Sequence, residues 1–301
     1  MVQNFLGIDI GGTKIFAVRM SASGKIEQEY KIPTEAAESQ ERVLKNIAFA
    51  VEKVRTSQTI GIGFSWAGFV DAQKGIVHHA PNISGFSNFA LQKWAEKTFH
   101  LPIQIENDAR LFALAHYKKY NISNLLGIVL GTGVGSGAIV DGHLLRGSQN
   151  FAGEVGHMKF SGIEIEDQLS GPALKKFLGR DSLRGEKITL SQIEPVLDIF
   201  ADWLHSLLFA YNPENIFLGG GVGTHIYTDF LADLGAKLHE RIKAHDYPLK
   251  CEIVVSDFPD ASAVGAAELI QEHLRSGERR LDFSRNSSPE ALLQGLGRRN
   301  V

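Results

Sequence analysis

The sequence predicts an α/β protein built from two similar α/β domains that face a shared cleft. The first observation is a weak internal repeat, in which residues 6–13 are echoed 120 positions later by residues 126–133. The second is the alternation of strand-like and helix-like stretches that follows each copy. The third is the length, because 301 residues suffice for two domains with separate cores.

The first half begins with a β-hairpin over residues 5–20, whose two strands are joined by a glycine turn. A third strand is expected over 25–30, after a turn at 21–24. Apolar residues at helical spacing predict a helix over 41–55, and a buried strand follows at 59–65. We expect a turn at 66–71, a short extended piece at 75–79, a loop at 80–86, a helix at 91–99, a strand at 101–105 and a helix at 109–117.

The second half restarts with a hairpin over 126–140 that ends in a turn at Asp141-Gly142. The remaining elements are a long apolar helix at 193–211, a strand with a glycine cluster within 212–222, a helix at 230–242, a strand at 251–255 and a helix at 261–274. We therefore expect residues 1–117 to form a smaller domain and 118–275 a larger one, although the last helix could return to the smaller domain. Residues 276–301, poor in apolar side chains, are expected to be a C-terminal tail.

Composition excludes several classes of function. The formal net charge of −3 leaves no basic excess for binding nucleic acid. The single cysteine, Cys251, allows no intrachain disulfide and no multi-cysteine metal site. No apolar run approaches the roughly 20 residues that span a bilayer, and the N-terminus lacks the features of a signal peptide. These features predict a cytoplasmic protein without a membrane partner.

The polar triplet Glu106-Asn107-Asp108 follows an apolar strand and precedes a helix. Open α/β sheets bind their ligands at this edge, where strands end and helices begin. Asp108 is therefore a candidate catalytic carboxylate. The same residue type is also common as an ordinary cap or first-turn residue of a helix, and the triplet alone leaves both interpretations open.

Glycine-rich turns stand on either side of that triplet, at Gly11-Gly12-Thr13 and at 131–135. Glycine lets backbone N–H groups approach a phosphate chain without a Cβ in the way. Each turn leads into a strand, so neither is a Rossmann turn, and the Walker A signature is missing. Singly, each could be a plain hairpin turn. Asp9 is an acid on an apolar strand, and its expected use is to hold Mg²⁺ through water beside the phosphates.

Four blocks of sequence together resemble the ROK family of sugar kinases: residues 9–14, 106–109, 130–135 and 153–158. Residues 212–214 with the glycine triplet 219–221, and Gly265-Ala266-Ala267, extend the resemblance to about residues 5–275. The resemblance implies the duplicated, ribonuclease H-like fold of actin-like ATPases, with two α/β domains around a cleft. It also implies an ATP-dependent kinase that phosphorylates a hexose hydroxyl, such as the 6-hydroxyl of glucose, fructose, mannose or an N-acetylhexosamine.

By the same resemblance, Asp108 is the general base that takes the proton of the attacking sugar hydroxyl, and ATP and Mg²⁺ are the cofactors. A hinge between the halves is expected to close on the substrates and exclude water. The residues implied in binding the sugar are Asn82, Asn107, Asp108, Glu154, His157 and Glu166. Those implied in binding the nucleotide are Asp9, Gly11, Gly12, Thr13, Lys14, Gly131, Thr132, Gly133, Gly135, Gly220 and Gly221.

One stretch departs from the family pattern. Most members carry a cysteine cluster after the Gly-His block, which binds a structural Zn²⁺ together with the His. Here residues 159–165 contain no cysteine, so no zinc is expected and His157 is free to act as a hydrogen-bonding residue. We expect His78, His79 and His143 to be surface or turn residues.

The two alternative functions are a non-catalytic sugar-binding sensor of the same family and another actin-fold ATPase. Sugar-sensing repressors of the family carry a helix-turn-helix before the first hairpin, and only four residues precede Phe5. Another actin-fold ATPase, such as a chaperone or filament subunit, would have no use for the Glu154 and His157 block without a polyol substrate. A homodimer is possible from the family alone, and the sequence does not decide it.

Overall fold

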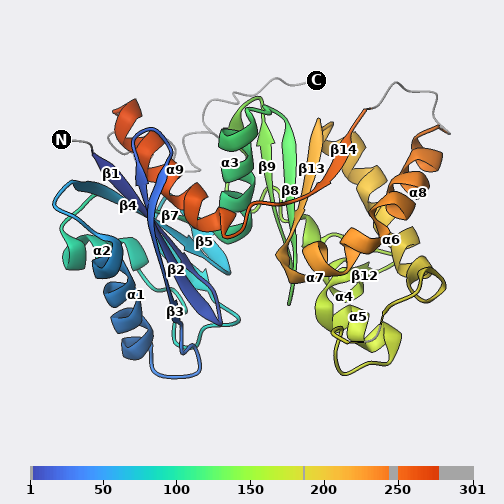
Figure 1. Ribbon diagram of the computed structural model, residues 1–301, viewed down its shortest axis with the longest axis horizontal. Coiled ribbons are helices and arrows are strands. Elements are labelled where there is room, and N and C mark those ends of the chain that lie inside the picture. The colour runs from blue at the N-terminus through green and yellow to red at the C-terminus, as the bar shows by residue number, and fades with distance from the viewer. Residues whose placement is uncertain (1–2, 186, 244–249, 278–301) are drawn as a thin grey trace, which may run out of the picture.

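The computed structural model describes residues 3–185, 187–243 and 250–277. Two five-stranded sheets of matching strand order form its framework, one on either side of helix α3 (Figure 1). The first sheet has the order β3-β2-β1-β4-β7 and the second the order β10-β9-β8-β13-β14. The predicted repeat therefore corresponds to two sheets of the same topology.

The first sheet begins with the predicted hairpin. Its strands β1 and β2 are antiparallel, and Asp9 lies opposite Phe16. Strands β4 and β7 are parallel to β1, which places Asp9, Ser65 and Glu106 side by side near the carboxyl edge of the sheet. The strands are β1 (Asn4–Ile10), β2 (Lys14–Ser21), β3 (Ile26–Pro33), β4 (Thr59–Trp66) and β7 (Ile103–Asn107).

Helices cover both faces of this sheet (Figure 1). Helices α1 (Gln40–Val54) and α2 (Leu91–Phe99) bury apolar side chains against one face. Helix α9 (Ala261–Ser276) comes from the far end of the chain and packs on the other face. It approaches so closely that a Cβ on Gly63 would lie 1.8 Å from the carbonyl oxygen of Ala266. Small residues at this contact are therefore a packing requirement.

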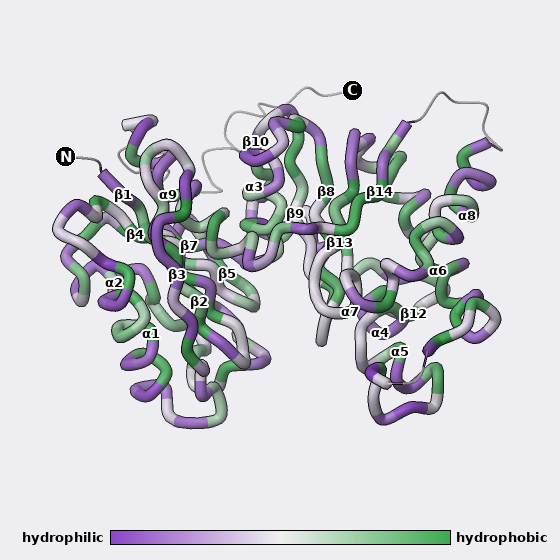
Figure 2. The backbone as a smooth tube through the Cα atoms, in the orientation of Figure 1, coloured by the Kyte–Doolittle hydropathy of each residue, from purple (hydrophilic) through white to green (hydrophobic). Residues whose placement is uncertain are grey.

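The second sheet is built in the same way around β8 (Leu125–Leu130), β9 (Val134–Val140), β10 (His143–Leu144), β13 (Asn215–Gly219) and β14 (Glu252–Val255). Val129 occupies the position that Asp9 has in the first sheet, so the repeat in structure does not repeat the acid. The long helix α6 (Leu190–Tyr211) supplies much of the apolar core next to it, and Figure 2 shows hydrophobic colour along β8 and α6.

Shorter elements complete the chain. The first half also has the hairpin β5 (Phe69–Asp71) and β6 (Ile76–His79). The second half has η1 (Val155–His157), β11 (Lys159–Phe160), β12 (Ile163–Glu164), α4 (Glu166–Leu169), α5 (Gly171–Leu178), α7 (Gly220–His225), η2 (Tyr227–Phe230) and α8 (Leu231–Lys243). No helix among the described residues combines the length and the apolar character needed to cross a bilayer.

Helix α3 (Asp108–Tyr120) is buried between the two sheets and α9. Glycines allow the close approach on two sides, because a Cβ on Gly127 or Gly137 of the second sheet, or on Gly265 of α9, would collide with α3. These contacts fix α3 relative to the second hairpin and α9, and its direct continuation from β7 fixes its N-terminus relative to the first sheet. We propose that the boundary between the two domains lies at residues 117 and 118, within the last turns of this helix.

The structure corrects some predicted bounds. The stretch 66–71, expected as a turn, contains strand β5, because the β5–β6 hairpin continues it. The helix expected at 109–117 begins at Asp108 and ends at Tyr120. The glycine cluster after β13 opens helix α7. Of the expected tail 276–301, residues 278–301 lie outside the described residues.

Candidate active site

Asp108 occupies the first turn of helix α3, immediately after strand β7. The cap itself is Asn107, whose Oδ1 accepts hydrogen bonds from the N–H groups of Ala109 and Arg110 at 3.0 and 3.1 Å. The Nδ2 of Asn107 donates to Oδ1 of Asp108 at 3.1 Å. The sequence left open whether Asp108 caps the helix or lies in its first turn, and the structure places it in the first turn. Its side chain is partly buried and not sealed in the core.

Asp9 is the last residue but one of strand β1, near the same edge of the sheet, and is also partly buried. Ser65 of the neighbouring strand donates a hydrogen bond to its Oδ1 at 2.5 Å. Loss of solvation raises the pKa of Asp9 to about 6, against the opposing effects of Ser65 and the Lys14 ammonium. An acid held at this edge can therefore change its charge near neutral pH.

The pKa of Asp108 is raised further, to about 7. Desolvation by the surrounding protein is the largest cause, and the negative charge of Asp9 is the next. The charge of Glu154, from the other half of the chain, acts in the same direction. A carboxylate with a pKa near neutrality is well matched to accept a proton from a hydroxyl group.

Lys14 and helix α9 connect the first hairpin to Asp108. The Lys14 ammonium forms an ion pair with Asp260, the residue that precedes α9. Two residues further on, the hydroxyl of Ser262 donates to the backbone oxygen of Asp108 at 2.9 Å. Asp260 and Ser262 were not predicted as part of the site: the sequence allowed the last helix to return to the smaller domain, but nothing in the local pattern indicates which residues it contacts there.

Glu106 is fully buried and binds two arginines. Its Oε1 accepts from Arg110 at 3.3 Å and its Oε2 from Arg146 at 2.7 Å. Arg110, itself only 1% exposed, also donates to Glu154 at 3.0 Å and to the backbone oxygen of Asn150. A buried carboxylate needs such partners to stay charged. The i, i+4 spacing of Glu106 and Arg110 was the one sequence signal for this network.

The residues expected to bind a sugar gather partly around Glu154. Its pKa is raised, with desolvation as the largest cause and the Arg110 charge opposing it. His157, three residues on, is exposed; its Nδ1 lies 3.1 Å from Oε2 of Glu164 and its ring stacks on Phe69 at 5.7 Å. The backbone oxygen of Gly68, next to Phe69, accepts from Asn107 Nδ2 at 3.0 Å. His157 and Asn107 are therefore linked through Phe69 and Gly68, and Asn107 contacts Asp108. Glu154 lies three residues before His157 in the chain.

Asn82 lies against the first glycine turn. A Cβ on Gly12 would come within 2.8 Å of the Asn82 Cβ. Asn82 is exposed, as is Thr13, while Gly11 and Gly12 are partly buried. The first hairpin and the loop around Asn82 thus form one surface.

Glu166 is placed differently from the other expected sugar ligands, because it lies against the second glycine turn. Its Oε2 accepts from the N–H of Val134 at 2.8 Å, and a Cβ on Gly133 would lie 2.4 Å from the same oxygen. Thr132 is exposed and Gly131 is partly buried. Gly135 faces the start of α3, since its Cβ would lie 2.9 Å from that of Ala109.

Gly220 opens α7 beside the same turn. Its φ of +75° is a conformation that favours glycine, and a Cβ there would lie 2.3 Å from the carbonyl oxygen of Leu130. Gly221 has open space around its Cα and is exposed. Gly220 and Gly221, both expected to contact a nucleotide, therefore differ in their packing. The fold requires glycine at position 220 but not at position 221.

The carboxylates at this edge of the sheet suit some metal ions better than others. The carboxylate oxygens of Asp9 are hard ligands of the kind that Mg²⁺ prefers, and because Mg²⁺ often keeps several waters, a single acid suits an ion held through water. Zn²⁺ needs three or four protein ligands from His, Cys or carboxylates. Among residues 3–185, 187–243 and 250–277, no group of three such side chains could hold a metal ion.

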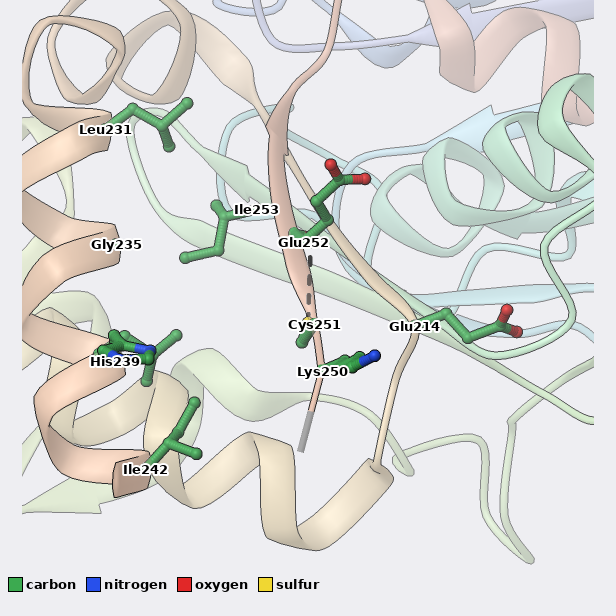
Figure 3. Close-up of a pocket in the computed structure, with 10 residues that line it drawn as sticks. Glu214, Leu231, Gly235, His239, Ile242, Lys250, Cys251, Glu252 and Ile253 are labelled. Carbon is green, nitrogen blue, oxygen red and sulfur yellow. Dashed lines mark hydrogen bonds between the residues drawn. The ribbon is translucent and has the colours of Figure 1, made fainter. Parts of the chain in front are cut away.

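A separate hollow of about 660 Å³ lies between α8 and β14 (Figure 3). None of the residues expected to bind sugar or nucleotide lines it. Its cysteine, Cys251, has a pKa raised to about 12, mainly by burial and then by the charge of Glu252. The thiol therefore stays protonated at neutral pH and is a poor nucleophile. This hollow does not carry the chemistry of the site described above.

Comparison with known proteins gives consistent results. The model of the ROK family matches residues 5–273. A glucokinase of Halalkalibacterium halodurans is 36% identical over 51% of this chain and 49% of its own length, so the chain spans about half of that relative. An uncharacterised protein of Clostridium perfringens is 30% identical over 72% of this chain and 81% of its own. The crystal structure of the ROK hexokinase from Thermus thermophilus superposes with a TM-score of 0.75 at 24% identity, covering 91% of this chain and 100% of that one.

Proposed function

The chain belongs to the ROK family, and from this premise we propose that it is a sugar kinase that transfers the γ-phosphoryl group of ATP to a hexose hydroxyl. Its fold is the actin-like ATPase fold expected from the sequence. We place the enzyme in the cytoplasm as part of the same proposal.

The observation that carries the proposal is the position of Asp108. It stands at the start of α3, where the charge of Asp9 acts on it and Gly135 of the second turn faces the neighbouring Ala109. Its pKa of about 7 makes it able to accept the proton of an alcohol while remaining ionised in half or more of the molecules above that pH. Phosphoryl transfer requires mainly such positioning and charge neutralisation.

The two glycine turns are proposed to hold the phosphates of ATP, with Lys14 as a nearby cation. Gly220 and Gly221 would adjoin the rest of the nucleotide, next to Leu130 at the start of the second turn. Asp9 would hold Mg²⁺ through water, and the bound ion would neutralise the phosphate charge. A cation there would also favour the ionised form of Asp9.

The sugar is proposed to bind between Asp108, Asn107, Glu154 and His157, with Asn82 at the edge. Glu166 is included in the sugar site in the same proposal. In the structure it accepts from Val134, so it would have to exchange that hydrogen bond for a sugar hydroxyl when the substrate binds. Carboxylates and amides suit a polyol because they accept or donate to neighbouring hydroxyl groups.

The test is a coupled assay of ADP release with Mg-ATP and a panel of hexoses: glucose, fructose, mannose, N-acetylglucosamine and N-acetylmannosamine. We expect sugar-dependent ADP release with at least one of them, and phosphorus NMR of the product should place the phosphate on the 6-hydroxyl. The proposal would be refuted if adding a sugar left ADP release unchanged for every hexose of the panel and for every disaccharide of these hexoses.

A further inference from the structure

A tight hairpin, β11–β12, follows His157 in the second half of the chain. Its strands pair so that Lys159 lies opposite Glu164. The two residues between the strands, Ser161 and Gly162, have φ values of +51° and +82°. Positive φ at both central positions is what a type I′ turn requires, and such a turn fixes the register of a hairpin. The turn therefore determines where Glu164 lies relative to His157, which comes two residues before Lys159.

Gln168 of α4 holds this hairpin in place. Its Nε2 lies within hydrogen-bond distance, 3.0–3.4 Å, of three backbone oxygens of the hairpin, those of Phe160, Ile163 and Glu164. Ile165, directly after β12, is fully buried in the apolar core of the second half. Helix α4 then begins with Glu166, another residue proposed to bind the sugar. The hairpin thus has a fixed position relative to the proposed sugar site.

Two contacts fix the ring of His157. Its Nδ1 lies 3.1 Å from Oε2 of Glu164, and its ring stacks on Phe69 with an interplanar angle of 24°. The stacking sets the plane of the ring, and the hydrogen bond sets its rotation within that plane. An ionised carboxylate can only accept, so Nδ1 carries the proton. In the neutral ring Nε2 is then an acceptor, and it has no hydrogen-bond partner in the part of the chain that the structure describes.

The Nε2 atom is the nitrogen of His157 that a sugar can use. The two nitrogens of an imidazole point in well-separated directions, so Nε2 faces away from Glu164. The ring lies close enough to Glu154 for its charge to act on that carboxylate, and the charge of Glu154 acts in turn on Asp108. A sugar bound beside Asp108 and Glu154 is therefore within the surroundings of His157, where one of its hydroxyl groups can donate to Nε2.

Side-chain contacts alone must orient His157. Residues 159–165 contain no cysteine, and no three His, Cys, Asp or Glu side chains of the described ranges gather to hold a metal ion. The carboxylate of Glu164 instead occupies the side of Nδ1 from which a metal ion would bind. The side chains of His157 and Glu164 are 46% and 37% exposed, and such exposed pairs contribute little to stability. The pair should therefore affect the orientation of His157 more than the stability of the fold.

We propose that Glu164 is a positioning residue of the sugar site: it holds Nδ1 of His157 so that Nε2 accepts a hydrogen bond from a sugar hydroxyl, and no metal ion takes part. This inference rests on the proposed sugar kinase function and adds a residue to which the family resemblance assigns no role. Glu164 takes no part in phosphoryl transfer, so its removal weakens the binding of ground state and transition state equally. A loss of that kind raises KM and leaves kcat unchanged.

The experiment measures steady-state kinetics of Glu164→Ala, His157→Ala and the double variant, with the best sugar of the panel. Each single change should raise the KM for the sugar about tenfold, which corresponds to about 1.4 kcal/mol, with kcat and the KM for ATP unchanged. The double variant should be no worse than His157→Ala, because Glu164 acts through His157. Glu164→Gln should stay close to the parent chain, because its amide oxygen still accepts from Nδ1. Asp167→Ala, at an exposed acid of α4, is the control.

The outcomes separate this proposal from the kinase activity. If the parent chain phosphorylates a sugar and Glu164→Ala keeps the parental KM, the positioning role is refuted and the kinase activity stands. A double variant that loses the product of the two single effects also refutes the role, since the residues would then act independently.

Two further measurements do not depend on turnover. Elemental analysis of the purified chain should find no zinc, and one zinc ion per chain would overturn the proposal. Calorimetry measures sugar binding directly, and Glu164→Ala should weaken it about tenfold. If no sugar is phosphorylated, the kinase activity is refuted; weaker binding in Glu164→Ala would still support the positioning role, and unchanged binding would refute it.

Discussion

The negative charge of Asp9 raises the pKa of Asp108, although Asp9 lies in strand β1, Asp108 lies in helix α3, and the two are 99 positions apart in the sequence. The parallel pairing of β1, β4 and β7 brings their carboxyl ends to one edge of the sheet. Two acids that share an edge with limited solvent disfavour each other's ionisation. The fold thereby produces a carboxylate whose proton affinity is tuned near neutral pH.

Asp108→Ala is expected to lower kcat for sugar phosphorylation by about 10²–10⁴, because a positioned general base contributes that much. Sugar binding should largely survive, since Asn107, Glu154 and His157 remain. Steady-state kinetics with the best sugar of the panel measure the first effect, and calorimetry measures the second. Asp229→Ala, at an exposed acid of η2, is the control. Full activity in Asp108→Ala would exclude Asp108 as the base.

The pH dependence of the reaction should report the pKa of Asp108. A general base must be ionised, so kcat/KM should rise with pH between 6 and 8 and reach half of its maximum near pH 7. Residual turnover of Asp108→Asn should lack this rise. The measurement is a kcat/KM profile with ATP and Mg²⁺ held saturating. A profile that is flat from pH 5.5 to 8 would contradict the assignment.

Asp108→Asn is expected to stabilise the protein at alkaline pH. The pKa of Asp108 is about 7 in the folded chain and ordinarily 3.8, so the folded state binds more protons between these values and loses stability as pH rises through them. Above pH 7 the ionised, desolvated carboxylate destabilises the fold fully, and asparagine removes that effect. We expect Tm to increase by about 2–4 °C at pH 8 and by much less at pH 4.5. An increase of equal size at both pH values would argue against this origin.

Local sequence patterns suffice to predict part of the fold. The glycine turns, Asp9 and Asp108 were identified from residue types next to strand ends, and the matching order of the two sheets confirms the predicted repeat. The register of β1, β4 and β7 then brings the acids together, which follows from parallel pairing alone.

Contacts between distant segments could not be predicted in this way. The pairing of Lys14 with Asp260 depends on α9 returning across 246 positions, and the pairing of Arg146 with Glu106 depends on a loop after β10. Neither segment has a periodicity or spacing that names its partner. The position of Glu166 beside Gly133 was not predicted either, because a family resemblance indicates the role of a residue and not its contacts.

Arg110→Ala is expected to reduce the free energy of unfolding by about 3–5 kcal/mol, because it leaves Glu106 and Glu154 with one buried cationic partner fewer. The KM for the sugar should also rise, since Glu154 loses the group that holds it. Chemical denaturation measures the first effect and kinetics the second. Arg42→Ala removes an exposed arginine from its ion pair with Glu35 and should cost much less than Arg110→Ala, because water and salt screen an exposed pair. Similar losses in the two variants would show that the buried network contributes little.

Gly220→Ala and Gly221→Ala form a matched pair that tests the second nucleotide-binding region. At Gly220 a Cβ would meet the Leu130 carbonyl oxygen at 2.3 Å and would require φ of +75°, so the substitution must move the start of α7 or the end of β8. We expect it to lower Tm and to raise the KM for ATP about tenfold, because Leu130 leads directly into the second glycine turn.

At Gly221 a Cβ meets nothing within 4 Å, and alanine favours the helix, so Tm should stay equal or rise slightly. A KM for ATP that rises in Gly221→Ala without loss of Tm would indicate direct contact with the nucleotide. Equal Tm values for both variants and the parent chain would contradict the close packing of Gly220 on β8.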